Sequence, residues 1–147
     1  MIKVSQGCLG EEELQAVKEA FAYGYFGHAY KVEQFEQELQ AYLGNGQVVA
    51  VNTVTSALHL ALDALGIGAG DEVIVPSLTF VASFQAISMV GATPVACEVS
   101  PDTLLMDMQD VLTLITDRTK AIIPVHYAGN PCDMEQLLRL KESRGIR

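Results

Sequence analysis

Three hydroxyl side chains crowd one turn of the sequence, Thr53, Thr55 and Ser56. Residues 48–51 before the turn are apolar and mostly β-branched, which predicts a short buried strand. After the turn, apolar residues recur at the spacing of one helical face, which predicts an amphipathic helix ending near Gly66. Free N–H groups at a helix start attract anions. Thr55 and Ser56 are therefore candidate phosphate ligands, and an ordinary Ser/Thr cap without a ligand is the alternative.

Two further loops carry side chains that suit a ligand site. Phe80 follows the expected strand 72–75, and its ring either packs in the core or faces a flat ligand. His126 and Tyr127 follow the expected strand 120–125, where a single histidine fits a structural role as well as a catalytic one. The glycine-rich run 66–70 follows a helix and precedes a strand, so its context is wrong for a dinucleotide-binding fingerprint.

Composition and charge exclude several classes of partner. The net charge is −9, which argues against nucleic acid and anionic membranes as partners. The three cysteines, Cys8, Cys97 and Cys132, lack the spacing of a zinc site or a disulfide framework, so no metal ligand is expected. We expect Cys97 to be a core thiol. With no signal peptide and no long apolar run, the sequence predicts a cytoplasmic protein.

Strands and helices are expected to alternate from residue 48 onward. Further strands are predicted at 72–75, 93–99 and 120–125, with helices at 79–90 and 107–115 and a last helix between Asp133 and Gly145. Nearly continuous apolar strands predict a doubly wound α/β fold, a mainly parallel sheet covered on both faces. Ligands collect at the carboxyl ends of such strands, so the loops after residues 51, 75 and 125 are predicted neighbours.

Both ends of the chain carry their own signals. Helices are predicted at 11–22 and 31–43, joined by a loop rich in glycine and aromatic residues, and the second helix should turn Val32, Phe35, Leu39 and Tyr42 inward. At the other end, residues 145–147 look like a helix stop followed by the start of a strand. A sheet that stops there predicts that the chain is a fragment.

Considered together, these stretches resemble the DegT/DnrJ/EryC1/StrS family of sugar aminotransferases, pyridoxal-phosphate enzymes of fold type I. The matching motifs, in the family's order, are TSALHLAL (55–62), GIGAGDEVIVPSLTFVA (66–82), GATPV (91–95), TKAIIPVH (119–126) and GNPCDM (129–134). The stretches VEQFE (32–36) and YLG (42–44) are similar to the family's N-terminal helix.

The resemblance implies roles for particular residues. Thr55 and Ser56 correspond to positions that hold the phosphate of pyridoxal 5′-phosphate, and Phe80 to the aromatic residue that stacks on its ring. Val54 stands where the family usually has glycine, which puts phosphate binding in question. By the same likeness, residues 1–44 are expected to form a helical arm and residues 45–147 an incomplete cofactor-binding large domain.

The resemblance also implies what the chain lacks. The Asp that pairs with the pyridine nitrogen and the Schiff-base Lys would lie beyond Arg147, so no catalytic residue is assigned and the isolated chain is expected to be inactive. The parent enzyme would move an amino group from glutamate to a nucleotide-linked keto sugar, for surface polysaccharide or a natural product. It would act as a homodimer or higher oligomer. A sugar dehydratase of the same family, or a non-catalytic product that only folds or dimerises, are the alternatives.

Overall fold

The computed structural model describes residues 7–44 and 46–147. The chain divides into two compact units, residues 1–50 and 51–147. In the part of the chain that the structure describes, there is no helix long and apolar enough to cross a membrane.

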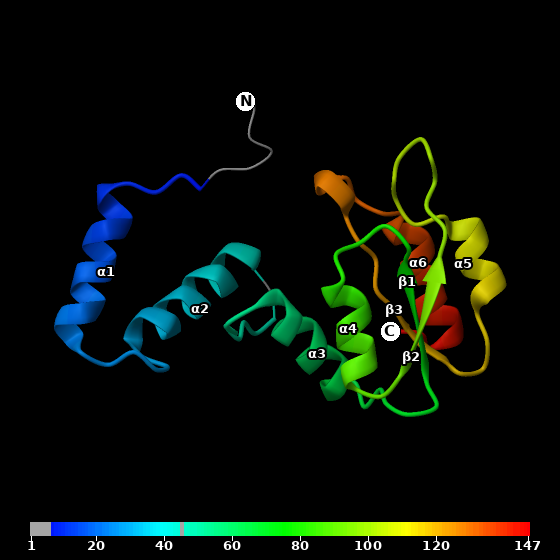
Figure 1. The fold of residues 1–147 in the computed structure, drawn as a ribbon, viewed down its shortest axis with the longest axis horizontal. Helices are drawn as coiled ribbons and strands as arrows, with labels where there is room; N and C mark the ends of the chain where they lie inside the picture. Colours follow the sequence, from blue (N-terminus) through cyan, green and yellow to red (C-terminus); the bar gives the residue numbers. More distant parts are fainter. Residues whose placement is uncertain (1–6, 45) are drawn as a thin grey trace. The chain divides into compact units, whose positions relative to one another are not determined.

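The first unit contains two helices, α1 (Glu11–Tyr23) and α2 (Tyr30–Leu43), as the sequence predicted (Figure 1). Each ends at a glycine with left-handed backbone, Gly24 (φ 76°) or Gly44 (φ 71°), a conformation that glycine adopts without strain. The expectation that Phe35 and Tyr42 face inward is wrong, because these side chains are 55% and 86% exposed. Two helices alone offer no second layer under which such rings are buried.

Polar and aromatic contacts join the two helices. Lys31 Nζ lies 3.1 Å from Glu19 Oε2, linking the start of α2 to α1. The rings of Tyr23 and Tyr30 meet edge to face, with centroids 5.0 Å apart across the loop. The hydrogen bond that Lys31 donates to Glu19 is the main reason why the pKa of Lys31 is raised.

A parallel three-stranded sheet is the centre of the second unit. Its strands are β1 (Glu72–Pro76), β2 (Thr93–Cys97) and β3 (Thr119–Ile122), in the order β2-β1-β3. Arg147 extends the ladder on the outer side of β3, since its N–H donates to Lys120 O (2.9 Å) and its carbonyl accepts from Ile122 N–H (2.8 Å). These are the hydrogen bonds of a parallel strand pair, as predicted for residues 145–147.

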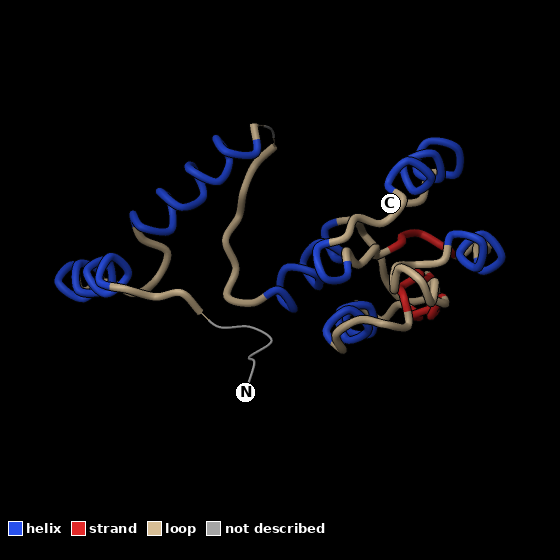
Figure 2. The backbone as a smooth tube through the Cα atoms, turned by 90° about the horizontal axis from the view of Figure 1, so that it is seen from above, coloured by secondary structure: helices blue, strands red, loops and turns tan. Residues whose placement is uncertain are grey.

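Helices cover both faces of the sheet, which confirms the doubly wound α/β prediction. They are α3 (Val54–Ala64), α4 (Ala82–Met89), α5 (Met108–Leu114) and α6 (Met134–Arg144), with a short 3-10 turn at Tyr127–Gly129. All five residues of β1 are buried. Ile74 packs in a cluster with α5 and α6, whereas Val73 and Val75 pack in a cluster with α3 and α4. Figure 2 shows the strands between these helices.

The predicted strand at 48–51 is wrong. These residues form no strand, and Val49 and Val51 are 78% and 39% exposed. A strand needs a neighbouring strand to pair with its backbone, and none lies beside this segment among the described residues. The N–H of Ala50 donates instead to the Glu36 carboxylate at 2.7 Å.

Strand and helix ends also differ from the predictions. The strand expected at 120–125 ends at Ile122, because Pro124 has no N–H to continue the ladder. The helix expected from residue 79 begins at Ala82, after a bend at residues 77–79. The expected strand 93–99 ends at Cys97, where the chain enters a loop.

Candidate functional site

The start of α3 is organised by a cap that the sequence reasoning did not assign to Thr53. Thr53 has extended backbone (φ −150°, ψ 156°), and its Oγ1 accepts the N–H of Ser56 at 3.0 Å. The Ser56 hydroxyl donates to Asn52 Oδ1 at 2.8 Å. A Thr three residues before a Ser, just ahead of an apolar run, was the available signal. The plain N-cap, one of the two alternatives, is therefore present.

This cap leaves donors free for a ligand. Among the described residues, the N–H groups of Val54 and Thr55 and the Thr55 hydroxyl have no hydrogen-bond partner. The first turn of α3 contains no acidic side chain that would compete for them. Two free N–H groups at the positive end of a helix dipole are suited to an anion. The cap therefore leaves unused the donors that a phosphate would need.

Val54, which stands where the family usually has glycine, is the first residue of α3. A β-branched residue adopts right-handed helical backbone without strain, so the local fold accommodates it. Its side chain is 74% exposed. An effect of this side chain on phosphate binding at the free N–H groups stays a prediction.

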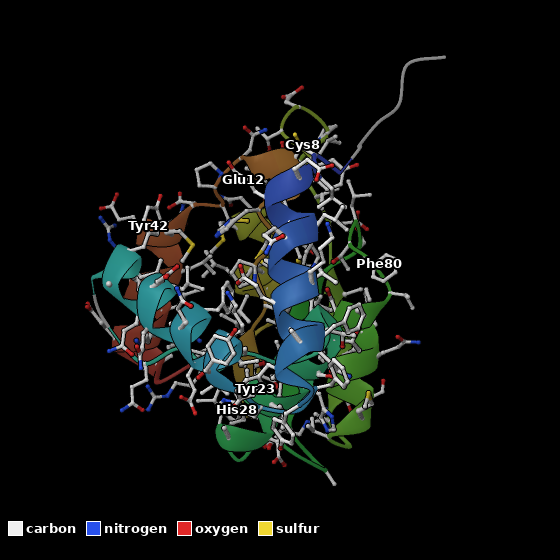
Figure 3. The ribbon with its side chains drawn as sticks, turned by 90° about the vertical axis from the view of Figure 1, so that its left-hand side faces the viewer. Cys8, Glu12, Tyr23, His28, Tyr42 and Phe80 are labelled. Carbon is white, nitrogen blue, oxygen red and sulfur yellow. The ribbon has the colours of Figure 1, made fainter. Side chains whose placement is uncertain are left out.

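The loop after β1 presents Phe80. The N–H of Ser77 donates to Cys97 O at 2.8 Å, and the Thr79 and Ser83 hydroxyls lie 2.8 Å apart at the start of α4. Ser83 is buried and its N–H donates to Phe80 O at 3.0 Å. The Phe80 side chain is 77% exposed and lies at the surface in Figure 3. It does not pack in the core, and its stacking on a cofactor ring stays a prediction.

The loop after β3 holds His126 by a contact that sequence reasoning missed. The N–H of Cys132 donates to His126 Nδ1 at 3.1 Å, and the Cys132 thiol donates to Val125 O at 3.2 Å. The six-residue spacing of His126 and Cys132 carries no recognised signal. The imidazole itself is exposed.

Two of these segments, the loops after β1 and β3, lie at one edge of the sheet. The loops bearing Phe80 and His126 leave the carboxyl ends of neighbouring parallel strands, as predicted. α3 packs against α4, and Figure 1 shows both helices running in the same general direction. No hydrogen bond joins the first turn of α3 to either loop within the described ranges.

Among the described residues of the second unit, Lys120 of β3 and Cys97 of β2 offer no reactive group to this edge. Lys31 is bound to Glu19 in the first unit, and Lys120 donates to Asp117 O at the opposite, amino end of β3. Burial raises the pKa of Cys97 to about 12, so its thiol stays protonated at neutral pH. The described residues also contain no cluster of three or more His, Cys, Asp or Glu side chains placed to hold a metal ion. The arrangement has the donors to bind an anion.

Comparison with known proteins identifies the family. Residues 7–147 match the DegT/DnrJ/EryC1/StrS aminotransferase family. The chain belongs to this family.

Solved structures agree with this assignment. The aminotransferase TlmJ from Streptoalloteichus hindustanus is 42% identical, with a TM-score of 0.93, over 99% of this chain and 40% of its own. DesV from S. venezuelae, solved with a ketimine intermediate, is 43% identical (TM-score 0.85; 92% and 38%). The PLP form of the sugar aminotransferase Spr1654 from Streptococcus pneumoniae is 37% identical (TM-score 0.92; 99% and 37%). The chain thus spans about two fifths of the length of these proteins.

Proposed function

We propose that this chain is the phosphate-holding part of a pyridoxal-phosphate-dependent sugar aminotransferase. The observation that carries the proposal is the pair of free N–H groups at Val54 and Thr55, beside the free Thr55 hydroxyl, in a chain of this family. The donor set fits a phosphate monoester, which offers several strong acceptor oxygens and a negative charge.

The chain's own residues would bind and orient the cofactor. Thr55 donates its hydroxyl and its N–H to the phosphate. Ser56, which the resemblance also implies as a phosphate ligand, already donates its N–H to Thr53 and its hydroxyl to Asn52, so we assign it the role of holding the helix start in shape. Phe80 is available to cover one face of the pyridine ring, because its side chain is exposed at the carboxyl edge of the sheet. When bound, the cofactor supplies the electron sink on which amino-group transfer depends.

The whole protein's reaction is part of the proposal. We infer transfer of an amino group from glutamate to a nucleotide-linked keto sugar, by a homodimer or higher oligomer located in the cytoplasm. Its support is the family and the sugar aminotransferase among the similar structures. The 147-residue chain alone is proposed to be inactive, because Lys120 of the second unit donates to Asp117 O at the amino end of β3 and Lys31 is paired with Glu19 inside the first unit.

Binding of pyridoxal 5′-phosphate to the purified chain tests the phosphate site. We expect binding that pyridoxal, which lacks the phosphate, does not show. Thr55→Val keeps the side chain's shape but removes its hydroxyl, and should weaken binding about ten- to hundredfold, since a hydrogen bond to a charged group contributes roughly 1.5–3 kcal/mol. Thr55→Ser keeps the hydroxyl and serves as the matched control. Equal binding of pyridoxal, or an unchanged affinity in Thr55→Val, contradicts the site.

The same sample tests the proposed inactivity. Borohydride treatment of the chain with pyridoxal 5′-phosphate should leave no cofactor mass on any specific lysine. A single lysine labelled in good yield would contradict that part of the proposal. Failure of all phosphate-dependent binding would leave the non-catalytic product that only folds or dimerises.

A further inference from the structure

The loop 123–133 reverses direction where β3 ends, and its backbone adopts an uncommon conformation to do so. Ile123 N–H donates to Ile74 O at 2.8 Å, the last bond to β1. Ala128 (φ 53°) and Gly129 (φ 84°) then follow each other in the left-handed region. Alanine rarely adopts that conformation, because its Cβ approaches the backbone carbonyl. Contacts elsewhere in the loop must therefore hold this turn.

Cys132 supplies those contacts from the far end of the loop. It is 5% exposed, and its N–H donates to His126 Nδ1 while its thiol donates to Val125 O. A buried N–H needs an acceptor, and the imidazole is the acceptor that the described residues provide. Ring and thiol together fasten the last residue of the loop back to its first residues.

This bond also fixes the tautomer of His126. A nitrogen that accepts a hydrogen bond carries no proton, so the neutral ring keeps its proton on Nε2. Among the described residues Nε2 has no hydrogen-bond partner and takes part in no ion pair. The side chain is exposed, so Nε2–H is an oriented donor at the carboxyl edge of the sheet.

We propose that His126 is a positioning residue: Nδ1 fastens the loop 123–133 through the N–H of Cys132, and the fixed ring presents Nε2–H to an acceptor oxygen of the ligand at this edge. The second half of this statement rests on the proposed function. The fastening itself needs no ligand and is tested separately.

Two substitutions separate the two nitrogens. In His126→Asn, the side-chain oxygen takes the place of Nδ1 and accepts the Cys132 N–H, but no donor remains at Nε2. In His126→Gln, an amide nitrogen reaches the place of Nε2, but the Nδ1 acceptor is lost. His126→Asn should therefore keep the bond to Cys132 and lose the donor, whereas His126→Gln should lose the bond to Cys132 and keep a donor.

Amide hydrogen exchange of Cys132 in the full chain measures the fastening. We expect His126→Gln to lower its protection about five- to tenfold, the effect of one hydrogen bond, and His126→Asn to stay near wild type. The Ile74 amide in the buried centre of β1 reports whether each variant is folded. Imidazole ¹⁵N shifts of the wild-type chain should show the Nε2–H tautomer. An Nδ1–H tautomer, or equal Cys132 protection in all three proteins with Ile74 still protected, would overturn the proposal.

Titration with pyridoxal 5′-phosphate measures the donor. His126→Asn should bind about two- to tenfold more weakly than wild type, with His126→Gln closer to wild type. Equal affinities of the three proteins would overturn the donor role. A wild-type chain that fails to bind pyridoxal 5′-phosphate while its Cys132 amide is protected would refute the phosphate site and leave the fastening in place.

Discussion

Glu72 is a buried carboxylate at the start of the central strand, and its replacement by Gln tests whether that strand depends on the charge. The side chain is only 8% exposed. It accepts a hydrogen bond from the Thr116 hydroxyl at 2.5 Å and lies 2.5 Å from Arg118 Nη2. The Glu72 N–H also donates to Arg118 O at 2.8 Å, so both the side chain and the backbone of Glu72 contact the turn at residues 116–118. These contacts join β1 to the turn that leads into β3.

The size of the effect follows from what Gln keeps and loses. Gln retains one acceptor oxygen, so either Thr116 or Arg118 loses its partner. A hydrogen bond to a charged group contributes about 1.5–3 kcal/mol, but the Arg118 side chain is 68% exposed and stays hydrated after the change. Gln also avoids the cost of burying a carboxylate. We therefore expect Glu72→Gln to lower the free energy of unfolding by about 1–2 kcal/mol.

A second Glu–Arg pair in the same unit is the matched control. Glu135 and Arg139 lie one helical turn apart on α6, and their side chains are 77% and 71% exposed. An exposed pair of this kind contributes roughly 0.3–0.5 kcal/mol, so Glu135→Gln should be nearly neutral. Both effects are measured by denaturant unfolding at neutral pH with the slope m compared among proteins. High salt should reduce the small Glu135 effect more than the Glu72 effect, because buried charges are screened less.

Equal effects of the two substitutions would refute the reasoning. A double-mutant cycle gives the sharper result: Glu72→Gln combined with Arg118→Gln should show a coupling of about 1 kcal/mol. A coupling near zero, with a destabilised Glu72→Gln single variant, would assign the loss to Thr116 and to packing instead.

Three further predictions concern a left-handed residue, a helix cap and the cysteines. Ala128→Gly should raise the free energy of unfolding by up to about 1 kcal/mol because it relieves left-handed backbone, whereas Ala57→Gly, inside α3, should lower it by about 1 kcal/mol in the same denaturant assay. Hydrogen bonds from the Gln136 backbone and side chain lower the pKa of Asp133. The stability from this cap is therefore present above the pKa of the unfolded Asp and lost as pH falls through the lower folded pKa, so Asp133→Asn should unfold with a weaker pH dependence below about pH 4. A thiol reagent at neutral pH should label only the exposed Cys8 in the native chain and all three cysteines after unfolding, because Cys97 and Cys132 are buried in the folded chain and burial also raises the pKa of Cys97 to about 12.

Local pattern predicted those elements whose own residues decide them. After Glu72, the rest of β1 (73–76) is an unbroken apolar run, which is typical of a strand buried on both faces. Asp133 and Gly145 bracket α6 because an Asp cap and a left-handed glycine act within one turn of the helix end. The same reasoning failed for residues 48–51, because a strand is made by its neighbour and the pattern of one segment does not contain that neighbour.

The candidate site was predictable only where a single helix end defines it. The sequence located the hydroxyl turn, yet it did not show that Thr53 takes the cap and leaves the Thr55 donors free. The exposure of Phe80 and the bond from Cys132 to His126 depend on how loops close, which periodicity does not encode. The burial of Glu72 is not predictable from the sequence, because an acidic residue next to a glycine loop looks like an ordinary surface charge.

The strand order carries a consequence for how the sheet is made during synthesis. β1 is the first of the three strands to leave the ribosome and the middle one in the finished sheet. β2 pairs on one side of it and β3, arriving later, on the other. Each new strand therefore adds to an open edge, and no existing pair has to separate to admit it. The sheet can grow outward in the order of translation, with β1 as the template for both partners.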